Sequence, residues 1–359
     1  MLVHICCSVD SHYFLQQLKL HYPNEKLVGY FYNPNIHPYS EYILRVQDVR
    51  YSCDRLNIEL FEGDYDLQGW LKATKGYENE PEKGSRCDIC FDNRLTNTIK
   101  MAKKLDQKSF TTTLLMSPKK SQEKLSKIGE KLAKQYDIEF VFEDFRTNNA
   151  PAEQSSQSKE AKLYRQNYCG CLYALKDQRE YQQKFAIELI SNIGKQILPN
   201  SIEEKLNLYR QRDKLIKNNK KFEIVKIDFL NYRVLNAYVK ISQNIVPSYF
   251  LIYSTIKNKK LKTKITTYQD GLAYAKNSKA IILNIDRLNK ELNRNYKNTK
   301  ELIYNPPLYQ DEINLREKLT KIAYSNIAII VLDNIPKENS LLFCDAISFD
   351  DTKECFFIW

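Results

Sequence analysis

The sequence lacks the apolar signatures of membrane and secreted proteins. No uninterrupted apolar run reaches the length that spans a membrane, and no basic stretch at the N-terminus leads into a signal-peptide core. We therefore expect a cytoplasmic protein that uses no membrane. In a reducing compartment, paired thiols serve more often as metal ligands or redox catalysts than as structural disulfides.

The second half of the chain is poor in glycine and proline and shows no internal repeat and no chemical motif. Its charge is distinctive: residues 181–359 carry 29 Lys and Arg against 19 Asp and Glu, whereas residues 1–180 carry 26 against 25. Such an excess fits a polyanionic partner, because neutralising phosphates releases counterions. A lysine-rich run such as residues 257–264 is equally typical of a solvated hairpin.

The first half alternates strands and helices, and 43% hydrophobic content in 359 residues is enough to bury a core in one large or two ordinary domains. The pattern predicts strands at residues 2–5, 27–32, 58–62, 110–115 and 139–142, and helices at 11–22, 38–56, 91–105 and 121–136. This rhythm predicts an α/β fold with a parallel sheet. Ligands gather at the carboxyl ends of such strands, where Cys6 and Cys7 would lie.

The pattern of the second half predicts an α+β extension. A long helical stretch is expected from about residue 176 to 220. Short strands are expected after it, at residues 222–229, 234–241, 248–256, 280–285, 327–332 and 356–359.

Six of the nine cysteines form three close pairs, Cys6 with Cys7, Cys87 with Cys90, and Cys169 with Cys171. Isolated cysteines are usually small buried hydrophobic residues, and we interpret the remaining three in this way, namely Cys53, Cys344 and Cys355. Close spacings point successive side chains in different directions rather than into one interior. The pairs therefore indicate a metal or redox centre.

Polar motifs surround these pairs in a fixed order. They read His4-Ile-Cys-Cys-Ser-Val-Asp10, Tyr32-Asn-Pro-Asn-Ile-His-Pro38, Glu41-Tyr42 with Arg45, Glu80-Pro-Glu-Lys-Gly84, Arg86-Cys-x-x-Cys90-Phe91 with Arg94-Leu95, Phe110-Thr-Thr-Thr-Leu-Leu-x-Ser-Pro118, Ser158-Lys159, and Tyr164-Arg-Gln-Asn-Tyr-Cys-Gly-Cys171. Over roughly residues 1–178, the chain resembles the QueH family of epoxyqueuosine reductases.

The resemblance implies a tRNA-modifying reductase that converts epoxyqueuosine to queuosine at the wobble position, the last step of queuosine biosynthesis. It also implies a fold similar to the adenine nucleotide alpha hydrolase (HUP) superfamily, a 4Fe-4S cluster with a neighbouring mononuclear iron, and no cobalamin. Removing an epoxide oxygen requires an electron reservoir and a Lewis acid, which iron centres can provide. The electron donor is unidentified.

The resemblance implies seven metal ligands, Cys6, Cys7, Asp10, Cys87, Cys90, Cys169 and Cys171. We expect Cys87 and Cys90 to bind the cluster with two thiolates from the other pairs, while the exact partition stays open. Asp10 stands where many members are expected to carry a third cysteine. A carboxylate is a harder ligand than a thiolate and favours a mononuclear or water-bridged role, so Asp10 is also a catalytic candidate.

The remaining site candidates come from the same motifs. His37 lies in a loop at a strand end and is the candidate proton donor for the departing oxygen. The residues expected to bind substrate are Tyr32, Asn33, Glu41, Arg45, Arg86 and Arg165. Structural roles stay open for them: Tyr32 and Asn33 would also suit a turn, Glu41 and Arg45 a helical surface pair, and the arginines ordinary surface charge.

Two other functions are considered. The first is an ATP-dependent tRNA thiolase or ligase of the same superfamily, but the loop Cys6-Cys-Ser-Val-Asp-Ser11 lacks the glycines that let backbone amides approach a phosphate. The second is a noncatalytic RNA-binding protein with a zinc ion at the last two cysteine pairs. Zinc would leave Cys6 and Cys7 without a role, and the spacing of the two pairs exceeds that of a compact zinc ribbon.

Two domains are expected from these observations. Residues 1–178 would form the iron-sulfur catalytic domain, and residues 179–359 a basic α+β domain. The second domain either binds the body of the tRNA or packs against the first.

Overall fold

The computed structural model describes residues 1–118, 120–146, 149–190, 194–275, 279–322 and 324–359. Its contacts divide the chain into two compact units. The first comprises Met1–Leu189, Lys205–Ile224 and Ile358–Trp359, and the second comprises Ile190–Glu204 and Val225–Phe357. The expected boundary after residue 178 differs from this division, because residues 205–224 return to the first unit.

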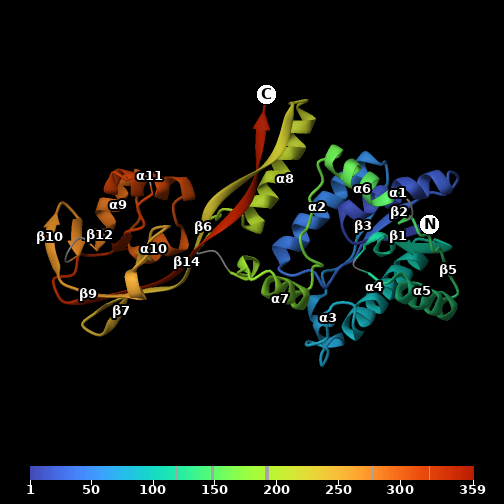
Figure 1. Ribbon diagram of the computed structural model, residues 1–359, viewed down its shortest axis with the longest axis horizontal. Coiled ribbons are helices and arrows are strands. Elements are labelled where there is room, and N and C mark those ends of the chain that lie inside the picture. Colours follow the sequence, from blue (N-terminus) through green and yellow to red (C-terminus); the bar gives the residue numbers. More distant parts are fainter. Residues whose placement is uncertain (119, 147–148, 191–193, 276–278, 323) are drawn as a thin grey trace. The chain divides into compact units, whose positions relative to one another are not determined.

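The first unit is built on a five-stranded parallel sheet in the order β3-β2-β1-β4-β5 (Figure 1). The strands are β1 (Leu2–Ile5), β2 (Val28–Phe31), β3 (Glu59–Glu62), β4 (Ser109–Thr112) and β5 (Glu139–Phe140). The predicted α/β fold is confirmed. Several expected strands are shorter, β4 among them: it ends at Thr112, whose hydroxyl accepts from the amide of Leu114 and begins the 3₁₀ helix η1 (Thr113–Met116).

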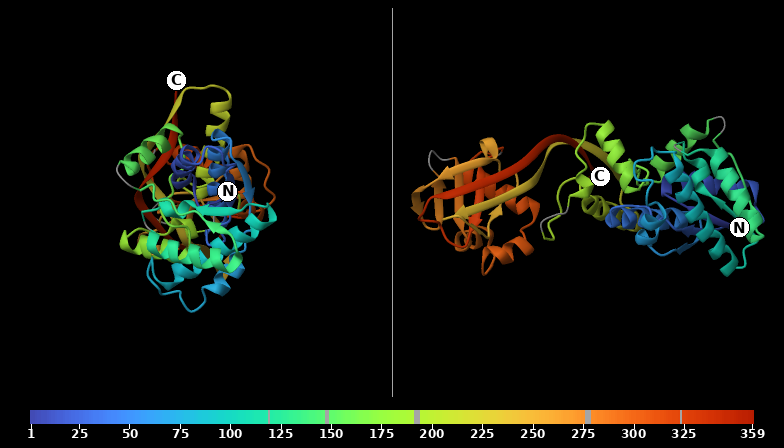
Figure 2. Two further views of the ribbon diagram at one scale, coloured as in Figure 1. Left: turned by 90° about the vertical axis from the view of Figure 1, so that its right-hand side faces the viewer. Right: turned by 90° about the horizontal axis from the view of Figure 1, so that it is seen from below.

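Helices cover both faces of this sheet, as Figures 1 and 2 show. On one face, α1 (Ser8–His21) and α2 (Tyr39–Arg55) pack on Val3 and Ile5 of β1. On the other, α4 (Ser85–Lys104) and α5 (Gln122–Tyr136) pack on Leu2 and Phe110. Alternating side chains of a strand point to opposite faces, so each buried strand supplies both cores.

Two helices begin earlier than the sequence pattern predicts, and both shifts concern cysteines. α1 starts at Ser8 with Cys7 at its N-cap, so Asp10 lies in the first turn. α4 starts at Ser85 rather than near residue 91, which places Cys87 and Cys90 in its first two turns.

The long helix expected from residue 176 to 220 is wrong. The chain instead forms α7 (Leu172–Tyr181), the 3₁₀ helix η2 (Ile187–Leu189) and α8 (Ile202–Lys217). Gln183 and Asn200 have φ values of 52° and 56°, and this left-handed backbone cannot continue an α-helix. The first unit also contains α3 (Leu67–Ala73) and α6 (Ala150–Glu160).

The second unit contains two sheets, which confirms the α+β prediction. A mixed sheet has the order β10-β11-β12-β13-β8, with β8 (Tyr249–Phe250), β10 (Ile265–Gln269), β11 (Leu272–Ala275), β12 (Ala280–Asn284) and β13 (Ala328–Leu332). A four-stranded sheet has the order β7-β6-β14-β9, with β6 (Phe222–Ile241), β7 (Asn244–Val246), β9 (Lys260–Thr263) and β14 (Ser340–Ile358). The strands expected at 222–229 and 234–241 are one strand, β6.

The mixed sheet lies between a helical layer and the four-stranded sheet. On one side, Ile281 and Ile329 pack with Leu288 and Leu315 of the helices; these are α9 (Ile285–Leu292), α10 (Thr299–Tyr304) and α11 (Tyr309–Thr320). On its other side, Ile282 packs with Val239 and Leu342 of β6 and β14. A short 3₁₀ helix, η3 (Lys257–Lys259), precedes β9. Across the described residues, no helix has both the length and the apolar content needed to cross a membrane.

Candidate active site and metal centre

The site lies where the strand order of the parallel sheet reverses. β1 and β4 are neighbours whose following helical segments, α1 and η1, begin at the same edge of the sheet. The amide of Cys6, just after β1, donates to Oγ1 of Thr113, just after β4, at 3.2 Å. Open α/β sheets bind ligands at such a switch point, outside the carboxyl ends of the strands.

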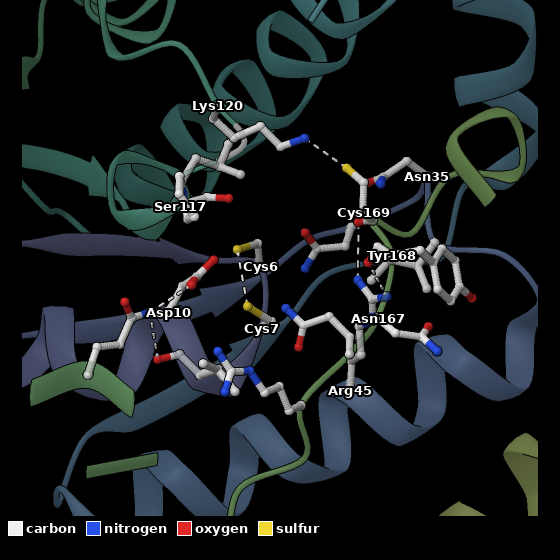
Figure 3. Close-up of a pocket in the computed structure, with 18 of the residues that line it drawn as sticks. Cys6, Cys7, Asp10, Asn35, Arg45, Ser117, Lys120, Asn167, Tyr168 and Cys169 are labelled. Carbon is white, nitrogen blue, oxygen red and sulfur yellow. Dashed lines mark hydrogen bonds between the residues drawn. The ribbon is translucent and has the colours of Figure 1, made fainter. Parts of the chain in front are cut away.

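The first group of ligating side chains is Cys6, Cys7 and Asp10. Their ligand atoms all lie within 4.8 Å of one another, and the two sulfurs are 3.7 Å apart (Figure 3). The contact with Cys7 lowers the pKa of Cys6 to about 7, whereas the contact with Cys6 and burial raise the pKa of Cys7. Burial also raises the pKa of Asp10, which accepts from Nε2 of Gln154 at 2.9 Å.

The second group is Cys87, Cys90, Cys169 and Cys171. Cys90 on α4 and Cys171 at the N-cap of α7 are buried around Trp70, with Cys169 packed against them. Burial raises the pKa of Cys87, and the neighbouring thiols of Cys169 and Cys90 raise it further. Two cysteine pairs with 78 residues between them in the sequence therefore lie together as one group of four thiols.

Donors around the second group are arranged for negative charge on the sulfurs. The amide of Lys83 lies 3.3 Å from Sγ of Cys87, and the amide of Ala174 lies 3.3 Å from Sγ of Cys171. Nζ of Lys120, a buried side chain, donates to Sγ of Cys169 at 2.9 Å. Burial alone would lower the pKa of Lys120, but Cys169, Cys87 and Glu82 together raise it.

Buried donors without a partner indicate that this group can hold a larger anionic species. Nε and Nη2 of Arg86 and Nε1 of Trp70 are buried and have no hydrogen-bond partner among the described residues. Trp70 packs on Cys90 and Cys171, and Arg86 attracts the thiolate of Cys171. Unsatisfied buried donors are rare, and iron-sulfur clusters accept hydrogen bonds at their sulfurs. Four thiolates with spare donors therefore fit such a cluster.

A cavity of about 280 Å³ connects the two groups. Cys6, Cys7 and Asp10 line one part of it and Cys169 another, while the cations at its wall are Arg45, Arg94, Lys120 and Arg165. Figure 3 shows Lys120 reaching across to Cys169 opposite the first group. Uncharged polar side chains complete the wall; they are Asn33, Asn35, Ser117, Gln154, Ser155, Gln166 and Asn167.

Three of the six predicted substrate residues line this cavity. Asn33 and Arg45 are buried, and Arg165 is exposed. Asn33 donates to the carbonyl of Ile5 at 2.8 Å and accepts from Arg94. Arg45 donates to the carbonyls of Cys169 and Tyr168 at 3.1 and 3.0 Å. Arg45 therefore fixes the backbone that carries Cys169, while Arg165 forms no ion pair within the described part of the chain.

The other three predicted substrate residues lie behind the cavity wall. Glu41 is buried and accepts from Nε of Arg45 at 2.7 Å. Arg86 is buried and donates to the carbonyls of Tyr77, Glu78 and Glu80, so its guanidinium holds a loop. Tyr32 is buried and stacks on Tyr30 with ring centroids 6.0 Å apart.

His37 does not line the cavity either. Its amide donates to the carbonyl of Gly170 at 2.8 Å, and its carbonyl accepts from the hydroxyl of Tyr168 at 2.7 Å. Burial lowers the pKa of its imidazole. The backbone of His37 thus positions the Cys169 segment, and its catalytic role stays a prediction.

The sequence reasoning missed two residues that the cavity brings to the thiols and to Asp10, namely Lys120 and Gln154. Lys120 belongs to the lysine pair after Pro118, and nothing in its spacing separates it from an ordinary surface lysine. Gln154 lies in the polar helix α6. Only the proximity of the β4 strand end to the cysteines could have pointed to Lys120.

A parallel α/β fold with two groups of thiols at one cavity is typical of a metal-dependent enzyme. The family model described as epoxyqueuosine reductase QueH matches residues 1–177. Epoxyqueuosine reductase QueH from Helicobacter pylori is 40% identical over 372 residues, which cover 100% of this chain and 100% of that protein. The protein of the same description from Thermotoga maritima is 36% identical over 183 residues, covering 50% of this chain and 92% of that protein.

The chain therefore belongs to the epoxyqueuosine reductase QueH family, and the predictions of this family and of its oxidoreductase class are confirmed. The two alternative functions, a thiolase or ligase and a noncatalytic zinc protein, belong to classes of protein other than this family. Among solved structures, the U34-tRNA thiolase NcsA from Methanococcus maripaludis with its [4Fe-4S] cluster aligns with a TM-score of 0.34 and 15% identity, over 59% of this chain and 72% of that chain. A likeness this weak supports no inference about the site.

Proposed function

We propose that this protein reduces epoxyqueuosine in tRNA to queuosine. The observation that carries the proposal is the cavity in which Cys6, Cys7, Asp10 and Cys169 meet four cationic side chains, in a chain that matches an epoxyqueuosine reductase from end to end. In the reaction both epoxide C–O bonds break and a C=C bond forms, while two electrons and two protons convert the oxygen to water. The electrons come from a separate electron donor. This donor binds either at another surface of the protein or at the same surface before or after the tRNA.

We assign a 4Fe-4S cluster to Cys87, Cys90, Cys169 and Cys171, and a second iron ion to Cys6, Cys7 and Asp10. Three of the four thiols pack around Trp70, Cys87 neighbours Cys90 and Cys169, and spare donors lie beside them. The mixed thiolate and carboxylate group has ligand atoms close enough for one ion. When bound, these groups would supply electrons and a Lewis acid for the departing oxygen.

The protein's own side chains position the substrate and stabilise its charge. Arg165 at the cavity holds a phosphate or ribose of the substrate. Gln154 fixes the carboxyl group of Asp10, and the ammonium of Lys120 lies at the wall between the two groups of ligands. Lys120 is therefore the cation best placed to stabilise negative charge on the departing oxygen, whereas its raised pKa makes it a weak proton donor.

The decisive experiment combines product analysis with metal analysis after anaerobic purification. With a chemical reductant, the protein should convert tRNA-bound epoxyqueuosine to queuosine, seen as the loss of one oxygen by mass spectrometry. Cys87→Ala should lose cluster absorbance and sulfide, whereas Asp10→Ala should keep both and lose turnover together with roughly one iron per chain.

Cys355→Ala is the matched control, since Cys355 lies on β14 in the second unit and should affect none of these readouts. No product from the iron-loaded protein would overturn the proposed reaction. Full retention of iron and sulfide in Cys87→Ala would instead overturn only the ligand assignment.

A further inference from the structure

The four-stranded sheet of the second unit has one face that the core does not cover. Val239 and Leu342 point inward to the mixed sheet, so their neighbours along β6 and β14 point outward. The register pairs Leu341 with Lys262 and Phe343 with Lys260 across β14 and β9. Basic and aromatic side chains of three strands therefore share this outer face.

Two aromatic rings lie at the middle of the face. Tyr238 of β6 and Phe343 of β14 stack with centroids 4.8 Å apart and an interplanar angle of 12°. Nζ of Lys240 lies 5.6 Å from the centroid of the Tyr238 ring. Both rings are only partly buried, so one side of the pair stays accessible.

The charge around these rings is mainly positive, with Asp345 of β14 as a nearby acidic residue. From Asp228 to Asp270 the sequence contains no acidic residue in between, while it contains seven Lys and Arg. Lys259 forms an ion pair with Asp345 at 2.8 Å. The exposed lysines that follow have no ion-pair partner among the described residues; they are Lys260, Lys262 and Lys264.

A groove of about 780 Å³ lies beside the aromatic pair. Lys240, Lys262 and Lys264 line it together with Ser242, Gln243 and Asn339. Ammonium groups supply attraction for phosphates, and hydroxyl and amide groups can hydrogen-bond to phosphate oxygens and 2′-hydroxyls. An accessible aromatic pair beside such a groove offers a surface on which ribose or bases stack.

We propose that this surface, the lysine groove (Lys240, Lys262 and Lys264 with Tyr238 and Phe343), binds the phosphodiester backbone of the substrate tRNA. The identity of the RNA rests on the proposed function, whereas the groove itself rests on the geometry of the second unit. The accessible aromatic rings favour RNA over an acidic protein, which would be recognised by the lysines alone.

The test uses the full chain and tRNA carrying epoxyqueuosine, with binding measured over a range of salt concentrations. Lys262→Ala with Lys264→Ala should weaken binding roughly tenfold near physiological salt and lower the slope of log affinity against log salt by about 1.5, since each lost phosphate contact removes about 0.7 to 0.9. The matched control removes two exposed lysines at the helical layer, Lys297→Ala with Lys300→Ala, and should leave affinity and slope unchanged.

Two readouts separate this inference from the proposed reaction. Reduction of an isolated anticodon stem-loop by a chemical reductant should stay at the wild-type rate in the groove variant, and failure of the wild-type protein in this assay would count against the proposed reaction alone. Wild-type affinity and slope in the groove variant, or equal losses in the control variant, would overturn the groove. The groove proposal would also be overturned if the groove variant bound tRNA normally and lost activity only when a protein supplied the electrons.

Discussion

Arg165 is an exposed cation at the cavity. Arg45 and Arg94 are each only 3% exposed, and they donate hydrogen bonds to the carbonyl of Tyr168 and to the side chain of Asn33. Charge-assisted hydrogen bonds contribute about 1.5 to 3 kcal/mol, which corresponds to roughly tenfold or more in affinity. Arg165→Ala should therefore raise KM for tRNA roughly tenfold, with little change in kcat and no change in iron content. Steady-state kinetics with metal analysis measures all three.

The control for this prediction is Arg55→Ala, since Arg55 is an exposed arginine of α2 that does not line the cavity. Wild-type KM in Arg165→Ala would show that its charge contacts no substrate. A loss of iron would show that Arg165 supports the metal centre instead.

The sequence predicted the chemistry of single residues better than it predicted where their side chains point. The unusual spacing of three cysteine pairs pointed to one centre, and the structure brings the six thiols and Asp10 into two groups at one cavity. For charged residues in the same motifs, the sequence does not distinguish an arginine at the wall, such as Arg165, from one that holds a loop, such as Arg86. That difference depends on long-range contacts, which leave no local pattern.

At the scale of secondary-structure elements, α2 is tied to the cysteine segment by one buried ion pair. Arg45 donates to Glu41 and to the backbone of Tyr168 and Cys169, and Glu41 also accepts from the hydroxyl of Tyr164 at 3.0 Å. Neither Glu41 nor Arg45 is more than 3% exposed. The pair therefore holds α2 against the loop that carries Cys169.

Glu41→Gln should destabilise the first unit by about 3 to 5 kcal/mol, because removing one partner leaves the other charge buried and uncompensated. Urea unfolding followed by circular dichroism measures the loss. Glu123→Gln is the matched control: Glu123 pairs with Lys127 at the same spacing on α5, at 2.5 Å, but the two side chains are 75% and 73% exposed. Equal stability of the two variants would contradict a structural role of the buried pair.

Helices and strands were predictable where their apolar residues follow one regular spacing along the sequence. The short apolar strands of the parallel sheet and helices such as α5 follow from their patterns, because each buries one face or both. The expected helix across residues 176–220 failed because a helical pattern carries no information on the left-handed residues Gln183 and Asn200. The early start of α4 was missed because its first turns contain polar residues and two cysteines instead of a regular apolar pattern.

At the scale of the whole molecule, the relatives differ in how much of this chain they match. The Thermotoga maritima protein is covered over 92% of its length by half of this chain, while the Helicobacter pylori protein matches throughout. The family model matches residues 1–177, so the first unit contains the part that defines the family. Its limits in this chain extend beyond residue 178, because residues 205–224 belong to it.

The reason is a buried charge on α8. Arg212 is completely buried and pairs with Asp48, which also accepts from the hydroxyl of Ser8 and from the amide of Tyr164 at 2.8 Å. The guanidinium of Arg212 lies 3.7 Å from the centroid of the Tyr51 ring. A chain that ends before α8 leaves Asp48 buried without its cation.

A chain that ends after Leu189 should therefore be less stable than one that ends after Ile224, by about 3 to 5 kcal/mol, the usual cost of a buried charge that has lost its partner. Urea unfolding of the two fragments measures the difference. Arg212→Met in the longer fragment should reproduce most of the loss, whereas Arg210→Met, an exposed position on the same helix, should not. If the fragment ending after Leu189 proved as stable as the longer one, α8 would not be part of the first unit, and that unit would end near residue 178, as the sequence motifs alone predict.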